Sequence, residues 1–268
     1  VTTGLIYQSL PITETFLENW KSEWASYLSD YHTTESKSVH LLESLGEIIA
    51  EPIFQFCKTN AFSKVIISPS SSLMSIPLHA LRLTHGKYLI EELIVTYLPS
   101  VAMIKTAHTH TTTQCLVFSH SGLGKSYIPN VSIEARYVEE TIPSILIPEN
   151  ETTLENFKSA VANVNTVHFS CHSKYQDEKP EHSSLFLQDT ITAKDISKLH
   201  LTHIELLFSA SCQSVKSISQ GLEYNGLIRA WLLAGVNNIV GTIWNLNDTF
   251  SLFFVKEYYA YHAAENDF

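Results

Sequence analysis

The sequence predicts an α/β fold in which a mostly parallel sheet is flanked by helices. In the second half of the 268-residue chain, short and nearly continuous apolar runs alternate with longer amphipathic segments. This pattern is typical of parallel strands that are buried on both faces and joined by helices. Hydrophobic residues make up 44% of the chain and charged residues 16%, as expected for a large buried core.

The first part of the chain is predicted to hold helices followed by two strands. Residues 13–59 show helical periodicity with a polar break at 30–37. The apolar run 65–67 predicts a buried strand, because it is short and ends at a Ser-Pro pair. A turn at Gly86 then leads into a second predicted strand over 88–98.

Residues 108–114 form the predicted linker between two parts of the chain, 1–107 and 115–268. The segment is polar and repetitive and shows no periodicity, which is typical of a solvated connector. Its His-Thr-His sequence leaves a metal site as the alternative interpretation.

After the linker the alternation of strands and helices becomes regular. We expect Gly235 to end a helix, because glycine readily adopts the left-handed conformation found there. The aromatic side chains of the last predicted helix share one face: Phe250, Phe253, Phe254, Tyr258 and Tyr261. The predicted strands are 115–118, 145–147, 164–169, 204–208 and 238–244, and the predicted helices are 133–141, 154–161, 223–234 and 250–261.

Charge and cysteine usage exclude several classes of protein. The formal net charge of −10 argues against direct nucleic-acid binding, which needs a basic surface. The four cysteines lie too far apart for a disulfide framework or a zinc ribbon, so we expect reduced thiols, a cytoplasmic location and no metal or other cofactor. No apolar run approaches the ~20 residues that span a bilayer, so no membrane association is expected. Val1 in place of methionine indicates a segment of a larger protein.

Two of the predicted strands end close to reactive side chains. His172 follows the run 164–169, and Cys212 follows the run 204–208. Since functional groups gather beyond the carboxyl ends of parallel strands, neighbouring strands would bring both side chains to one edge of the sheet.

A thiol and an imidazole in this arrangement suit nucleophilic catalysis. A free thiol has a pKa near ~8.5, so a histidine that takes the proton of Cys212 creates the reactive thiolate. Backbone N–H groups at Ser173 and Cys212 are placed to bind a developing oxyanion. The alternative is a buried structural cysteine and a hydrogen-bonded core histidine.

Residues 167–173, 208–214 and 241–248 resemble the three hallmark blocks of CHAT domains, which are relatives of caspases and separases. Upstream, residues 67–73 and 76–81 resemble a further block of that family, so the similarity spans roughly residue 65 to the C-terminus. The Gln-Ala-Cys signature of true caspases is absent, which argues against their preference for aspartate.

The resemblance implies a duplicated caspase-like fold, with an inactive half before the linker and an active half from Cys115. It implies hydrolysis of a protein substrate by a His172–Cys212 dyad without a metal, in a module controlled by a regulatory domain or an activating partner. Some relatives act as effectors in bacterial defence, including CRISPR-linked systems.

The resemblance also bears on four further residues. Asp248 holds the position of the separase acid that lines the pocket for a basic P1 side chain; capping of the following helix is its alternative role. Glu223 and Asn225 match an acidic spot of the family before the helix at Gly226, and capping of that helix start is the role we predict for them. Ser173 departs from the family pattern, which usually has glycine after the histidine.

Three features near the dyad are interpreted as non-catalytic. Residues 119–126 end in Gly-Lys-Ser, but Ser119 stands where a phosphate-binding loop needs glycine. Strand alternation turns Cys171 to the opposite face from His172, which predicts a core thiol. His168 is predicted to pack in the sheet.

The sequence therefore predicts a cytoplasmic cysteine endopeptidase, the regulated protease module of a larger protein. A catalytically silent scaffold is the alternative, motivated by Ser173. Nucleotide-dependent switching at Gly124, Lys125 and Ser126 is a third hypothesis.

Overall fold

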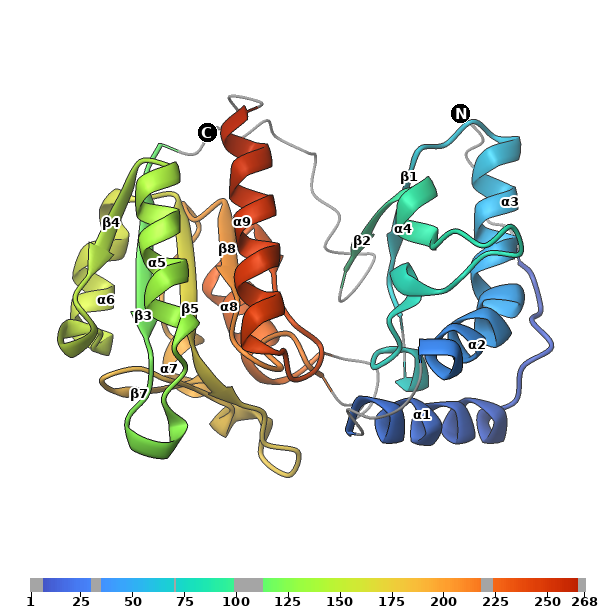
Figure 1. Cartoon of the computed structure of the whole chain (residues 1–268), viewed down its shortest axis with the longest axis horizontal. Coiled ribbons are helices and arrows are strands. Elements are labelled where there is room, and N and C mark those ends of the chain that lie inside the picture. Colours follow the sequence, from blue (N-terminus) through green and yellow to red (C-terminus); the bar gives the residue numbers. More distant parts are fainter. Residues whose placement is uncertain (1–6, 30–34, 70, 99–112, 218–223, 265–268) are drawn as a thin grey trace. The chain divides into compact units, whose positions relative to one another are not determined.

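The computed structural model describes residues 7–29, 35–69, 71–98, 113–217 and 224–264 (Figure 1). The chain divides into two compact units. Unit 1 comprises residues 1–105 and 219–223, and unit 2 comprises residues 106–218 and 224–268. The predicted linker, 108–114, lies largely outside the described residues.

Unit 1 packs helices around tryptophan side chains and carries a small sheet. Trp20 stacks on Trp24 with ring centroids 5.5 Å apart, and its indole N–H donates to the Leu41 carbonyl at 2.8 Å, which ties the first two helices together. Strands β1 and β2 pair in parallel. The elements are α1 (Glu14–Ser29), α2 (Glu35–Leu45), a π-helical turn η1 (Gly46–Ala50), α3 (Glu51–Thr59), β1 (Lys64–Ile67), α4 (Leu89–Glu92) and β2 (Ile94–Tyr97).

The prediction of a strand over 88–98 is wrong for its first part, which forms α4. The Glu91 carboxylate accepts the backbone N–H of Tyr88 at 2.7 Å, and this capping interaction stabilises a helical turn. The apolar side chain of Leu89, which favoured a strand in the sequence, is fully buried on that turn.

Unit 2 contains a mixed seven-stranded sheet. Strands β4, β3, β5, β8 and β9 lie side by side in parallel, in that order. The predicted sheet was mostly parallel; the antiparallel part arises because the end of β5 continues past its parallel neighbours and pairs with β6, which pairs with β7. The strands are β3 (Cys115–His120), β4 (Ser144–Ile147), β5 (Thr166–Lys174), β6 (Ser184–Phe186), β7 (Thr190–Thr192), β8 (Leu206–Ser209) and β9 (Asn238–Val240).

Helices cover both faces of this sheet (Figure 1). One face packs on α6, α7 and α8 through a core that includes Phe157, Phe169 and Trp231. The other face packs on α5 and α9 through a core that includes Val138 and Tyr259. The helices are α5 (Asn130–Thr141), α6 (Leu154–Ala160), α7 (Ala193–Ile196), α8 (Gly226–Ala234) and α9 (Asp248–Ala264). Gly235 follows α8 with φ of +103°, so its predicted role at the helix end is confirmed.

Most of the aromatic face of α9 is exposed in this structure, but Tyr258 packs against Phe208 with ring centroids 4.9 Å apart. Phe250 and Phe253 are 72% and 63% exposed, whereas Ser251, Val255 and Tyr259 are buried. The buried face of α9 therefore carries one hydroxyl, one aliphatic and one phenol side chain. It is not the face on which most of the aromatic residues lie, so the aromatic pattern alone does not identify it.

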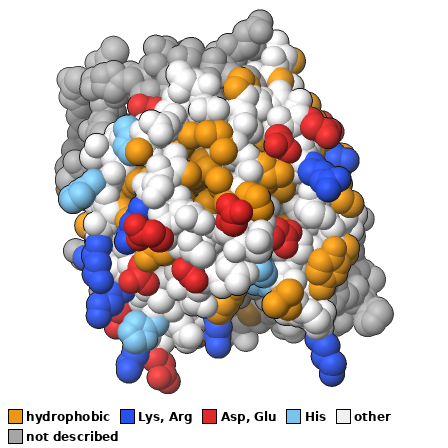
Figure 2. All heavy atoms as spheres, turned by 90° about the vertical axis from the view of Figure 1, so that its left-hand side faces the viewer, with side chains coloured by type: hydrophobic (Ala, Val, Ile, Leu, Met, Phe, Trp, Pro, Cys, Tyr) orange, Lys and Arg blue, Asp and Glu red, His pale blue; other side chains and the backbone are white. Residues whose placement is uncertain are grey.

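Strand β4 forms an edge of the sheet, on the side of the molecule seen in Figure 2. There hydrophobic side chains lie together with acidic side chains around them. Among the helices described, none is long and apolar enough to cross a membrane.

Candidate active site

The strands that lead to His172 and Cys212 are neighbours in the sheet, as the sequence predicts. Phe169 of β5 is in register with Ser209 of β8, and the backbone N–H of Ala210 donates to the Phe169 carbonyl at 2.9 Å. Cys212 follows the end of β8, as expected. His172 lies inside β5 rather than beyond it, because residues 172–174 pair with β6.

Two contacts hold the chain segments that carry His172 and Cys212 against each other. The Cys171 sulfur lies 3.4 Å from the Ser211 hydroxyl oxygen, and the Ser173 hydroxyl donates to the Cys212 carbonyl. In the sequence, His172 lies between Cys171 and Ser173, and Cys212 follows Ser211. The backbones that carry the imidazole and the thiol are thus adjacent.

The orientation of His172 is defined by a backbone carbonyl. The ring nitrogen Nε2 is hydrogen-bonded to the carbonyl oxygen of Ser126. A carbonyl oxygen only accepts hydrogen bonds, so Nε2 carries the proton and Nδ1 of the neutral ring is the basic atom. This partner could not be predicted from the sequence, because it is a backbone atom.

Cys212 differs from the other cysteines in exposure. Its side chain is half-buried, whereas Cys57, Cys115 and Cys171 are buried. Burial raises the pKa of Cys115 and of Cys171 to about 12. Cys171 packs in the core on the α8 side of the sheet, which confirms that it is a core thiol.

The turn after Cys212 is held by the segment that follows β9. Gln213 adopts a φ of +54°, a left-handed conformation that few non-glycine residues adopt. Its backbone N–H donates to the Trp244 carbonyl at 3.1 Å, and the N–H of Leu246 points to the Cys212 sulfur at 3.4 Å. The Thr242 hydroxyl donates to the Ser211 carbonyl at 2.6 Å. The third block of the resemblance therefore surrounds Cys212, a role that could not be predicted from the sequence.

Ser173 lies in the extended strand β5. Among the described residues, only Ala61 and Gln213 combine a side chain with a positive φ. The backbone at Ser173 therefore does not need glycine for its conformation, and the serine hydroxyl has a partner in the Cys212 carbonyl.

Asp248 begins α9, and its carboxylate accepts the backbone N–H of Asn130 at 3.2 Å. It therefore bonds the start of α5. The capping residue of α9 is Asn247, whose side chain accepts the N–H of Thr249 at 2.9 Å, so the predicted capping role of Asp248 in its own helix is wrong. Burial raises the pKa of Asp248; the bond from Asn130 acts against burial, and the Glu134 charge adds to the rise.

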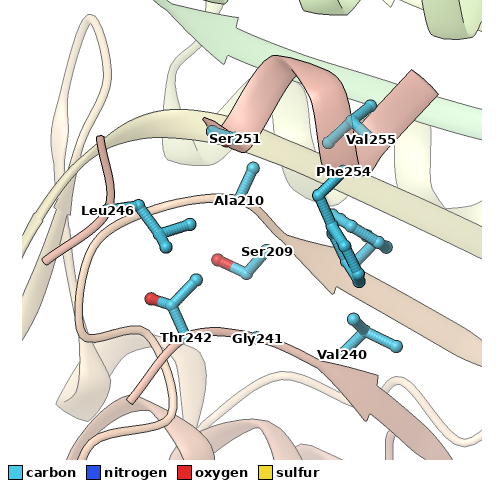
Figure 3. Close-up of a pocket in the computed structure, with 10 residues that line it drawn as sticks. Ser209, Ala210, Val240, Gly241, Thr242, Leu246, Ser251, Phe254 and Val255 are labelled. Carbon is cyan, nitrogen blue, oxygen red and sulfur yellow. The ribbon is translucent and has the colours of Figure 1, made fainter. Parts of the chain in front are cut away.

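A small cavity lies between the ends of β8 and β9 and the start of α9 (Figure 3). It measures about 30 Å³, close to the size of one water molecule and too small for an arginine side chain. The Ser209 hydroxyl lies in it and has no hydrogen-bond partner among the described atoms. The described residues that line the cavity are uncharged: Phe208, Ser209, Ala210, Val240, Gly241, Thr242, Leu246, Ser251, Phe254 and Val255.

The two remaining predicted positions are Glu223 and Asn225. Glu223 is outside the described residues. The Asn225 side chain does not cap α8; it accepts the hydroxyls of Tyr175 and Ser217, so the predicted capping role is wrong for this residue.

His168 is fully buried between the sheet and the helices α5 and α9, as predicted for a residue packed in the sheet. Its ring nitrogens lie 3.1 Å from a Glu134 carboxylate oxygen and 3.0 Å from the Tyr259 hydroxyl. The Ser251 hydroxyl donates to the other Glu134 oxygen at 3.2 Å.

The Gly-Lys-Ser stretch forms a short 3₁₀ turn at Gly124–Ser126, and α5 begins only at Asn130. The first N–H of α5 donates to Asp248 and not to a free anion site. No cluster of three or more potential metal ligands exists among the described residues; His108 and His110 lie outside them.

Comparison with known proteins identifies the family. The model of the CHAT domain matches residues 39–267. A search of curated proteins gives no match. Among solved structures, a short-chain flavodoxin associated with a bacterial microcompartment is similar to 58% of this chain and 98% of its own, at 11% identity and a TM-score of 0.30. With the family model covering most of the sequence, both units included, the chain belongs to the CHAT domain family.

Proposed function

We propose that this chain is a cysteine endopeptidase that cleaves a protein substrate with Cys212 as nucleophile and His172 as acid and base. The observation that carries the proposal is the junction of β5 and β8. It joins the segments of both residues through the Ser173–Cys212 hydrogen bond, and it leaves Cys212 more accessible than the other cysteines.

The chemistry follows from the state of the imidazole. Nδ1 of His172 takes the thiol proton, and the Cys212 sulfur then forms a bond to the scissile carbonyl carbon. The imidazolium returns this proton to the leaving amine as the C–N bond breaks, which leaves a thioester. A water molecule deprotonated by His172 hydrolyses the thioester and releases the thiol.

The oxyanion that forms during attack needs hydrogen-bond donors. We assign this role to the backbone N–H groups of Ser173 and Cys212. Support comes from the bond between the Ser173 side chain and the Cys212 carbonyl, which keeps the two peptide groups close together. Donors that are fixed before the reaction are worth far more than mobile ones.

An electrophilic peptide is expected to label one cysteine per chain. A peptidyl acyloxymethyl ketone should alkylate Cys212 at neutral pH, whereas a pKa of about 12 leaves Cys115 and Cys171 with a thiolate fraction of roughly 10⁻⁴ at pH 8. Mass spectrometry of tryptic peptides locates the label. Labelling no faster than that of the urea-unfolded chain, or equally fast in His172→Ala, would favour a silent scaffold.

Asp248 is proposed to select a basic P1 side chain. It lies two residues after Leu246, whose N–H contacts the nucleophile. A charged hydrogen bond contributes about 1.5–3 kcal/mol, so we expect a ~10- to 150-fold preference in kcat/KM for P1 arginine over its uncharged isostere citrulline. Because the pKa of Asp248 is raised, this preference should decline with falling pH before an ordinary aspartate would protonate.

Two substitutions separate this role from the bond to Asn130. Asp248→Asn keeps an acceptor for the Asn130 N–H but removes the charge, so it should lose the arginine preference and keep the thermal stability. Asp248→Ala should lose both. An arginine preference that survives in both variants would remove Asp248 from the P1 pocket.

The two units suggest an arrangement for the whole module. We propose that unit 1 is the inactive half of a duplicated caspase-like fold and unit 2 the active half, since both dyad residues lie in unit 2. A regulatory domain or an activating partner would control cleavage in the cytoplasm, in a bacterial defence system such as a CRISPR-linked one. Without that partner the chain is expected to cleave slowly, which is why labelling is the first experiment.

A further inference from the structure

The Ser-Gly-Leu-Gly-Lys-Ser segment, residues 121–126, lies beside the dyad. It follows β3 and ends at the residue whose carbonyl accepts the hydrogen bond from His172. Since the segment does not have the features of a phosphate-binding loop, its two glycines need another explanation. Both adopt a positive φ, +79° at Gly122 and +58° at Gly124.

The two glycines differ in what surrounds them. A Cβ atom built on Gly122 would lie 2.4 Å from the carbonyl oxygen of Ser126 and 3.2 Å from Cδ2 of His172. A Cβ atom on Gly124 would meet nothing within 4 Å. Both positions favour glycine for their conformation, but only Gly122 is packed against the two groups that form the His172 hydrogen bond.

The loop has little freedom to move away from an added methyl group. Its ends are joined by the Ile128 N–H, which donates to the Ser121 carbonyl at 2.7 Å. The Ser126 N–H donates to the Leu123 carbonyl at 3.1 Å. The Ser121 hydroxyl donates to Glu149 at 2.7 Å, which anchors the base of the loop to a separate segment.

We infer that Gly122 is a positioning residue, and that the loop 121–128 closes over it to fix the tautomer and orientation of His172 through the Ser126 carbonyl. The absence of a side chain at Gly122 lets the carbonyl and the imidazole approach each other over its Cα atom. This inference rests on the proposed function, because it assigns the loop a part in the acid–base step.

The test compares Gly122→Ala with the matched variant Gly124→Ala. Both substitutions impose the same kind of backbone strain, so the difference between them isolates the contact with Ser126 and His172. We expect Gly122→Ala to lower kcat by ~100-fold, as a displacement of about 1 Å in a catalytic group does, with KM nearly unchanged. Gly124→Ala should retain kcat within about twofold of the wild type, because the contacts that orient His172 are intact.

A spectroscopic measurement keeps the inference testable if Gly122→Ala does not fold. In the unmodified protein with ¹⁵N-labelled histidine, we expect neutral His172 to be the Nε2–H tautomer. An Nδ1–H tautomer, or a mixture of both, would overturn the inference. Equal kcat in the two glycine variants would do the same.

These outcomes differ from failure of the proposed function. A wild-type chain that neither cleaves peptides nor labels at Cys212, but shows the Nε2–H tautomer, would remove the protease and keep the His172–loop geometry. A wild-type chain that is active, with equally active glycine variants, would keep the protease and remove the positioning role.

Discussion

Cys212→Ala is expected to abolish peptide cleavage, with a loss in kcat of at least ~10⁴-fold, since the sulfur forms the bond to the substrate. His172→Ala should lower kcat by ~10²–10⁴-fold, the usual share of general acid–base catalysis. The double variant should be no slower than Cys212→Ala, because residues that act as one unit are not additive. Initial rates on one peptide, at equal protein concentrations fixed by absorbance, measure all three variants.

Cys171→Ala is the matched control for this experiment. Cys171 precedes His172 in β5 and contacts Ser211, which precedes Cys212. A loss of activity that came from a disturbed β5–β8 junction would therefore appear in Cys171→Ala as well. We expect this variant to be less stable but active. Cleavage that persists in purified Cys212→Ala would contradict the assigned nucleophile.

The neighbouring placement of the segments that carry His172 and Cys212 could be predicted from sequence, because each residue comes a few positions after a short, buried apolar run. Strands of this kind occupy the centre of a sheet, and β5 and β8 are indeed neighbours. The extension of β5 to Lys174 could not be predicted, because its pairing with β6 depends on a chain reversal over polar residues that carry no period-2 pattern.

The groups that orient the dyad were harder to predict for a different reason. The Ser126 carbonyl and the Leu246 N–H are backbone atoms, and every residue has these atoms. The two glycines of the loop are its one signal in the sequence, and they are easily interpreted as part of a phosphate-binding loop instead. Glu134 is a similar case, because its neighbours Glu139 and Glu140 on the same helix are exposed and look equivalent in sequence.

Glu134 is the acidic side chain that we expect to matter most for stability. It is 2% exposed, and its two oxygens contact His168, which is 0% exposed, and Ser251. Glu134 belongs to α5, His168 to β5 and Ser251 to α9, so one carboxylate joins two helices to the central strand. Removing one member of a buried polar pair leaves the other unpaired and costs about 3–5 kcal/mol.

Glu134→Ala is therefore expected to lower the free energy of unfolding by about 3–5 kcal/mol in urea titrations. Glu134→Gln, which keeps hydrogen-bonding groups in the same place, should lose less, about 1–2 kcal/mol. Glu139→Ala on the same helix removes an exposed carboxylate and should change stability by less than about 0.5 kcal/mol. A Glu134→Ala variant as stable as Glu139→Ala would show that the buried contacts contribute nothing.

The Glu134→Ala variant also tests whether the buried contacts of Glu134 affect the reactivity of Cys212. Ser251, which donates to Glu134, lies in the first turn of α9, and the residue before that helix, Asn247, follows directly on Leu246. Loss of Glu134 frees the start of α9, so the Leu246 N–H should hold the Cys212 sulfur less firmly. At temperatures where Glu134→Ala remains folded, we therefore expect slower alkylation of Cys212 than in Glu139→Ala. Equal alkylation rates with unequal stabilities would show that the buried network supports the fold without reaching the nucleophile.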